Sequence, residues 1–93
     1  MDKLPLSELT QRVSNAKDTI PVGSKWLHYK GGKYIVIDHV IIELTNEVGI
    51  VYISAENPTV KFLRPLVVWQ QAVEWEGQKT FRFRYASDSP EVE

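Results

Sequence analysis

Apolar residues in the first twenty positions recur at the spacing of an α-helix. They stand three and four positions apart at Leu6, Leu9, Val13 and Ala16, which would place them on one helical face. Ser7 stands where an N-cap residue is favoured. We predict a helix over residues 7–17. Its apolar stripe would cover one open end or face of the remaining fold, or dock on a partner or a second copy.

From Gly23 onward, short runs rich in Val, Ile, Tyr and Phe alternate with turn residues, which is the pattern of β-strands. The pair Gly31-Gly32 predicts a two-residue hairpin turn, because glycine accepts positive φ without penalty. Pro65 ends a strand, since proline cannot donate to a ladder. Residues 66–71 are ambiguous between a 3₁₀ turn and a strand. The predicted strands cover residues 26–30, 33–44, 48–54, 60–64, 72–76 and 80–85, with the last two joined across Gly77-Gln78.

Short strands separated by turns, with no helices between them, are typical of a barrel or sandwich rather than an α/β sheet. These six runs in about sixty residues best fit a small SH3-like β-barrel of about five strands. We therefore predict a mainly β protein with one short N-terminal α-helix. Its parts would be the helix and linker (1–22), the β-barrel domain (23–86) and an acidic tail (87–93) that we expect to be disordered.

Composition narrows the class of protein. A chain of 93 residues fits one domain with one core. The formal net charge of -1 argues against a protein that coats DNA, whose affinity would depend on neutralising phosphates. The absence of cysteine excludes disulfides and thiolate metal sites. No apolar run approaches the ~18 residues of a membrane span, and the N-terminus lacks the pattern of a signal peptide. We expect a cytoplasmic protein.

The best candidate binding residues flank the Gly31-Gly32 turn. On a strand, His28 and Lys30 would point to one face, and Arg64 at the end of another strand would join them. Such a group binds a phosphate or carboxylate through charge-assisted hydrogen bonds, with an aromatic ring stacked beside it. The candidate face comprises Trp26, His28, Lys30, Tyr52 and Arg64.

The alternative for these residues is structural. Tyr29 and Tyr34 would then belong to the core, while His28 and Arg64 would brace the glycine turn by hydrogen bonds.

A second candidate is a basic strip for nucleic acid or an acidic partner, formed by Lys61, Lys79, Arg82 and Arg84. Arg82 and Arg84 alternate with aromatic residues, so a continuous strand would place both arginines on one face. The alternative is a solvated face of a half-buried strand, with Glu74 and Glu76 opposite the arginines across the hairpin.

Two tryptophans are spaced too widely to assign to a common face. Trp75 would stand with Val73 on the core side. Trp69 would lie in the core, or form an exposed interface or stacking platform.

No metal, cofactor or catalytic residue is assigned. His28 and His39 are the only imidazoles. Asp38 and His39 are adjacent, so on a strand they would face opposite sides, which is poor chelating geometry. The serines lie in no nucleophile-elbow context, and no glycine-rich phosphate loop leads from a strand into a helix.

Residues 26–34 have the sequence Trp-Leu-His-Tyr-Lys-Gly-Gly-Lys-Tyr, and residues 62–66 have Phe-Leu-Arg-Pro-Leu. In these motifs the chain resembles the bacterial and phage family called domain of unknown function 1653. The likeness continues at residues 49–52, 73–77 and 81–83, and it spans residues 26–85. The resemblance implies a small SH3-like β-barrel but brings no established activity.

The chain also departs from that family. Residues 41–45 are Ile-Ile-Glu-Leu-Thr, where relatives usually carry a polar stretch. Leu27 and Glu56 stand where a basic and an aromatic residue are usual. These departures bear on a shared chemistry more than on a shared fold.

Three functions follow from these patterns. The leading hypothesis is a non-catalytic binding module that recognises a protein, a nucleic acid or a small anionic ligand through its aromatic and basic face. A small enzyme acting on a nucleotide-like substrate, with His28 as general base, is the alternative. The third is a bacterial or phage accessory protein that acts by helix-mediated homo-oligomerisation.

Overall fold

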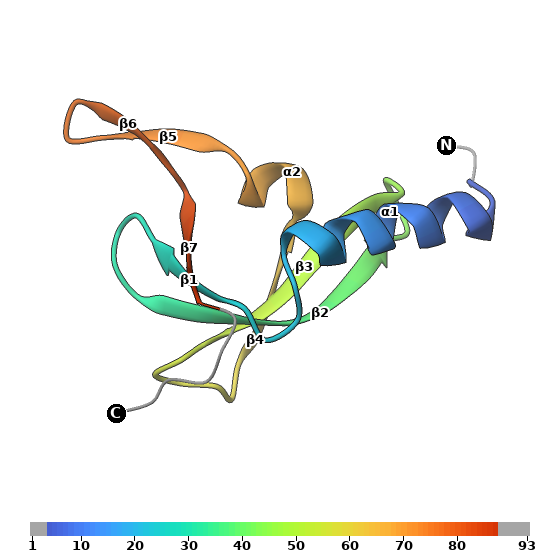
Figure 1. Ribbon diagram of the computed structural model, residues 1–93, viewed down its shortest axis with the longest axis horizontal. Coiled ribbons are helices and arrows are strands. Elements are labelled where there is room, and N and C mark those ends of the chain that lie inside the picture. The colour runs from blue at the N-terminus through green and yellow to red at the C-terminus, as the bar shows by residue number, and fades with distance from the viewer. Residues whose placement is uncertain (1–3, 88–93) are drawn as a thin grey trace.

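The computed structural model describes residues 4–87. Antiparallel strands are the main secondary structure, with one long helix before them and one short helix among them (Figure 1). In chain order the elements are α1 (Leu6–Thr19), β1 (Lys25–His28), β2 (Lys33–Ile42), β3 (Glu47–Ser54), β4 (Lys61–Pro65), α2 (Leu66–Trp69), β5 (Ala72–Trp75), β6 (Gln78–Phe81) and β7 (Phe83–Ser87). The predicted mainly β class with an N-terminal helix is confirmed. Beyond Ser87, the predicted acidic tail lies outside the described residues.

The strands form a five-stranded antiparallel sheet in the order β4-β3-β2-β1-β7, and a separate two-stranded hairpin of β5 and β6. The prediction of one continuous strand over residues 80–85 is wrong. Arg82 interrupts it: its backbone N–H donates to the Gln71 carbonyl, and its own carbonyl accepts from the backbone N–H of Tyr29. The chain therefore bends at Arg82, so β6 pairs with β5 while β7 pairs with β1.

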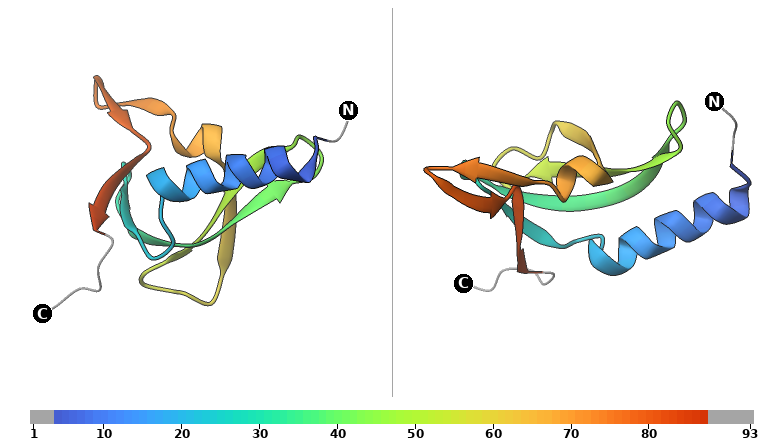
Figure 2. Two further views of the ribbon diagram at one scale, coloured as in Figure 1. Left: turned by 45° about the vertical axis from the view of Figure 1, so that its right-hand side comes forward. Right: turned by 90° about the horizontal axis from the view of Figure 1, so that it is seen from above.

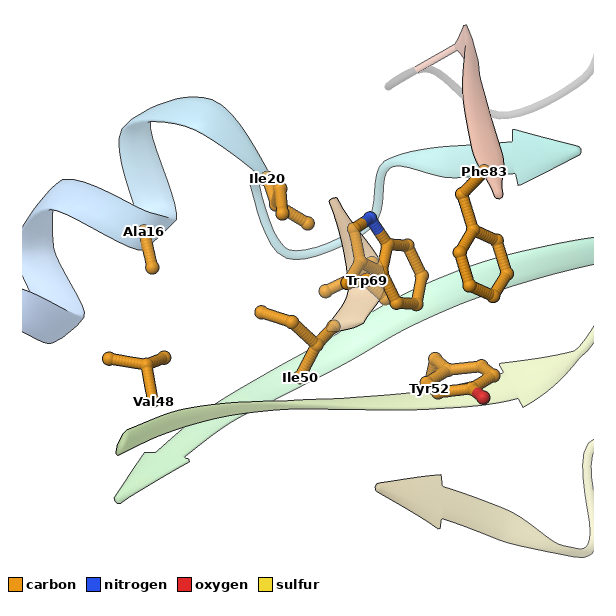
Figure 3. Close-up of a cluster of buried hydrophobic side chains, with 8 residues drawn as sticks. Ala16, Ile20, Val48, Ile50, Tyr52, Trp69 and Phe83 are labelled. Atoms are coloured by element: carbon orange, nitrogen blue, oxygen red, sulfur yellow. The ribbon is translucent and has the colours of Figure 1, made fainter. Parts of the chain in front are cut away.

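The sheet does not close into the predicted barrel. Within residues 4–87 its edge strands β4 and β7 do not pair with each other. Instead the sheet curls, and Trp69 of α2 fills the space inside the curl (Figure 3). The indole stacks on Phe83 of β7, with ring centroids 3.8 Å apart, and meets Tyr52 of β3 edge to face at 5.0 Å. The Trp69 side chain therefore links the two ends of the curled sheet by packing, where a closed barrel would link them by backbone hydrogen bonds.

The helix α1 begins at Leu6, with Pro5 at the N-cap position and no side-chain cap. The prediction that Ser7 caps the helix is therefore wrong. The Pro5 carbonyl accepts from the backbone N–H groups of Glu8 and Leu9 instead. The second half of α1 packs on the sheet through Ala16, which is buried, whereas Leu6 is 81% exposed.

The core joins both helices to strands β2, β3 and β7 (Figure 3). Its buried apolar residues are Ala16, Ile20, Val36, Val48, Ile50, Tyr52, Trp69 and Phe83. His39 of β2 is also buried and lies 2.6 Å from the Ile20 carbonyl through Nε2, which links the sheet to the end of α1. Trp69 is thus a core residue, whereas the prediction for Trp75 is wrong, because Trp75 lies on the separate hairpin and is 42% exposed.

Candidate functional site

The face of the five-stranded sheet that carries the core, here called the inner face, also carries most of the candidate binding residues. Cross-strand partners share a face of a sheet. Trp26 pairs with Tyr34 and Tyr85, and His28 pairs with Phe83. Toward the opposite edge of the sheet, Tyr52 of β3 pairs with Phe62 of β4, and Ile50 of β3 pairs with Arg64 of β4. Trp26, His28, Tyr52 and Arg64 therefore share the inner face.

His28 ends β1 and braces the glycine turn. Its backbone N–H donates to the Gly32 carbonyl, and its carbonyl accepts from the Gly31 N–H. Both glycines have positive φ, near 101° and 94°, which favours residues without a Cβ. The ring nitrogen Nδ1 accepts from the backbone N–H of Lys30 at 3.2 Å. Because Nδ1 must then carry a lone pair, the neutral imidazole holds its proton on Nε2.

Arg64 lies on edge strand β4 and takes no part in that turn. Its Nε donates to the Tyr52 hydroxyl at 3.2 Å. Its guanidinium carbon also lies 5.6 Å from the centroid of Phe83, which belongs to the opposite edge strand β7. Arg64 thus spans the seam between the two edges of the sheet, held by a neutral hydroxyl and an aromatic ring.

Arg82 reaches the same region from the bend between β6 and β7. Its Nη2 donates to Gln71 Oε1 at 3.3 Å, while its Nε is buried and has no hydrogen-bond partner among residues 4–87. Lys30 is exposed, and its Nζ lies 5.7 Å from the centroid of the Tyr29 ring. We call His28, Lys30, Arg64 and Arg82 the cationic cluster.

The pKa of His28 shows how these groups act on one another. Burial lowers this pKa below its usual value, and the charges of Arg64, Arg82 and Lys30 lower it further, in that order. Among the described residues, none of the four members forms an ion pair; their partners are a hydroxyl, an amide, a backbone N–H and aromatic rings. Within residues 4–87 the cluster is therefore a site of positive charge without a neutralising carboxylate.

Aromatic rings surround this cluster. His28 lies 4.6 Å from the ring of Tyr29 and 5.0 Å from the ring of Phe83. Phe83 also lines a neighbouring cleft of about 370 Å³. The other walls of the cleft include Ile20, Trp26, Trp69 and Tyr85. The indole N–H of Trp69, in the wall of this cleft, is buried and has no hydrogen-bond partner in the described part of the chain.

The four residues of the predicted basic strip are placed apart. Lys61 lies on β4, and Lys79 lies on β6 opposite Glu74. Arg84 lies on β7 opposite Leu27, whereas Arg82 belongs to the cationic cluster. The bend at Arg82 removes the strand alternation on which the strip depended. Sequence reasoning thus placed Arg82 with the wrong neighbours, and it assigned Phe83 no part in the site because the pairing of β1 with β7 joins distant segments.

Within residues 4–87, no group of three or more His, Asp or Glu side chains is arranged to hold a metal ion. In the same residues, no helix is both long and apolar enough to cross a membrane.

Comparison with known proteins identifies the family. The model of the family described as "Protein of unknown function (DUF1653)" matches residues 24–85. A crystal structure of a DUF1653 protein from Bordetella bronchiseptica is similar, with a TM-score of 0.61 and 28% sequence identity over 74% of this chain and 92% of that one. No curated protein matches the chain. With two thirds of its length covered by the family model, the chain belongs to the DUF1653 family of proteins of unknown function.

Proposed function

We propose that this protein is a non-catalytic binding module for a small anionic ligand that carries a planar ring. The observation behind the proposal is the cationic cluster, in which an imidazole and the charges of Lys30, Arg64 and Arg82 converge with no carboxylate from residues 4–87 paired to them. Like charges held close together raise the free energy of the unliganded site. A phosphate or carboxylate would relieve that repulsion and accept charge-assisted hydrogen bonds from the two arginines, each contributing about 1.5–3 kcal/mol.

The tautomer of His28 fits the role of a donor. Because Lys30 N–H occupies Nδ1, the proton on Nε2 is available to an anion. The same arrangement weighs against the enzyme alternative, since a neutral His28 has no free lone pair with which to act as a general base. The lowered pKa would otherwise favour that alternative.

We further propose an SH3-like arrangement in which the barrel stays open along the seam between β4 and β7. Support comes from the sheet order, with β4 and β7 at its edges, and from the contact of Arg64 with Phe83. A ligand at the seam would place its anionic group on the arginines and its planar ring against the aromatic walls of the adjoining cleft. A long nucleic acid is less favoured, because the remaining basic residues do not extend the cluster into a strip.

Calorimetric titration with sulfate, inorganic phosphate, acetate and nucleoside monophosphates tests the proposal. We expect one or more of these anions to bind, and binding to be lost in Arg64→Ala while the circular dichroism spectrum is unchanged. Lys79→Ala is the matched control, because Lys79 is basic but lies on the β5–β6 hairpin. If no anion binds, or if both variants weaken binding equally, the proposed function is wrong. Unfolding of Arg64→Ala would favour the structural role instead.

A further inference from the structure

The face of the sheet opposite the inner face, here called the outer face, is apolar at its centre. Residues on this face alternate along each strand with the core residues. The registers place Ile35 opposite Ile53, and Val51 opposite Leu63. The aliphatic residues of the outer face are Leu27, Ile35, Val40, Ile42, Val51, Ile53 and Leu63. A strand that faces water on one side normally alternates apolar with polar residues, and these strands do not.

The surroundings of Gly49 show that these side chains gather on the outer face. A Cβ atom built on Gly49 would overlap Cδ1 of Leu63 and lie 3.1 Å from Cγ2 of Val40 and 3.3 Å from Cγ1 of Ile42. Three aliphatic side chains from three positions therefore converge over one glycine. They form a continuous apolar surface across β2, β3 and β4.

Neither helix covers this surface. Both helices pack on the inner face instead. Ala16 and Ile20, at the end of α1, and Trp69 of α2 belong to the same core as Val36 and Ile50. Figure 2 shows α1 running along one side of the sheet. On the outer face Leu63 is 53% exposed, and the other six aliphatic residues are partly buried. Exposed apolar surfaces that extend over several strands mark interaction sites in soluble proteins.

Charged residues at the two ends of the outer face indicate what covers it. Lys25 and Lys61 flank Ile35 and Ile53 in one row across the sheet, and Arg84 lies opposite Leu27 in the next row. Toward the β2–β3 turn the charges are acidic: Asp38 lies opposite Val51, and Glu47 lies opposite Ile42. The half of the outer face near the Gly31-Gly32 turn is therefore basic and the half near the β2–β3 turn is acidic, with aliphatic residues in both halves.

We propose that the outer face binds the outer face of a second copy of this chain. A two-fold axis that crosses the strands would lay the basic end of one copy on the acidic end of the other and bury the aliphatic centres together. The product is a two-layer sandwich of sheets, an established packing for antiparallel sheets with two apolar faces. The cationic cluster lies on the inner face, so the dimer leaves both seams open to ligand.

Sedimentation velocity of the full chain over a range of concentrations tests the dimer. We expect the wild type to dimerise, and Ile53→Lys to remain folded and monomeric at the same concentrations, because it places a charge among the aliphatic residues that the interface buries. Leu6→Lys is the control, since Leu6 is exposed on α1 rather than on the outer face. A monomeric wild type overturns the proposal. So does loss of the dimer in Leu6→Lys but not in Ile53→Lys.

Charge reversal gives a second test that does not touch the apolar centre. The double variant Lys25→Glu/Lys61→Glu should weaken dimerisation by about tenfold or more. Adding Asp38→Lys and Glu47→Lys to the same chain should restore it, because the polarity of the face is then inverted rather than removed. Failure of this restoration, with all variants folded, would overturn the two-fold arrangement. Anion binding is measured separately, so a monomeric protein that still binds anions would refute only the dimer.

Discussion

The guanidinium carbon of Arg64 lies 5.6 Å from the centre of the Phe83 ring, although the two residues belong to opposite edge strands of the sheet. Strands in a flat sheet are about 4.8 Å apart, so the edges of five strands would be roughly 19 Å apart. The contact therefore shows that the sheet has curled far enough to bring side chains of its two edge strands together. It also joins a charged group of the candidate site directly to the core, since Phe83 stacks on Trp69.

The hydrogen bond from Arg64 to Tyr52 should couple the site to stability. Tyr52→Phe removes the acceptor of this bond, and we expect a loss of about 0.5–1.5 kcal/mol in the free energy of unfolding. Urea denaturation of Tyr52→Phe, Arg64→Ala and the double variant measures the coupling. Strictly additive losses would show that the bond contributes nothing.

Two tryptophans should differ sharply in their contribution to stability. Trp69 is 2% exposed, and Trp69→Ala should lower the free energy of unfolding by about 3–5 kcal/mol. Trp75 is 42% exposed, so Trp75→Ala should cost about 1 kcal/mol or less. Denaturation followed by circular dichroism compares the two. Equal losses would contradict the placement of Trp69 inside the curl.

Gly49 should resist even the smallest substitution. Gly49→Ala would press a methyl group against Leu63, and we expect a loss of about 1–3 kcal/mol in the free energy of unfolding. Shortening the neighbour in Gly49→Ala/Leu63→Ala should recover part of this loss, because the overlap disappears. Thermal denaturation of the single and double variants decides. A harmless Gly49→Ala would mean that Leu63 does not lie over this position.

His28 should make stability depend on pH. The folded protein lowers the pKa of His28, whereas the unfolded chain takes up this proton near pH 6.5. As pH falls below about 6.5, the unfolded state binds more protons, so the fold loses stability until pH drops past the folded pKa. His28→Gln should lack this component. Urea denaturation of both proteins between pH 7.5 and 5 measures the difference, and parallel curves would contradict it.

Anion binding should show the opposite dependence at the same residue. A bound anion favours the protonated imidazole, so affinity for the ligand should rise as pH falls below neutrality. Sulfate is a suitable probe because its charge does not change in this range. Titrations of wild type and His28→Gln at pH 7 and 5.5 compare the slopes. Equal slopes would separate His28 from the site.

Local features of this fold can be predicted from the sequence better than contacts between distant segments can. Gly31-Gly32 marks the first hairpin, because its positive φ angles are a property of glycine itself. The predicted two-residue turn is nevertheless wrong, since β1 ends at His28 and residues 29–32 connect it to β2. From that hairpin, alternation alone places Trp26 and His28 on one face. The meeting of Arg64 with Phe83 depends instead on the curl of the whole sheet, which no local pattern contains. The bend at Arg82 was missed because aromatic and basic residues alternate straight through it.

That bend bears on how the chain reaches its native state. Because β7 leaves the last hairpin at Arg82 and pairs with β1, Lys25 finds its partner Ser87 at the far end of the described chain. Pairings between such distant segments slow folding, because closing the long loop costs conformational entropy before any stabilising contact has formed. During synthesis, β1 through β4 and then α2 leave the ribosome before β7. Trp69 of α2 therefore lacks its contact with Phe83 until β7 emerges. Until β7 arrives, the nascent sheet exposes its outer face and the part of its inner face that Phe83 covers, so aggregation or chaperone capture competes with folding during this interval.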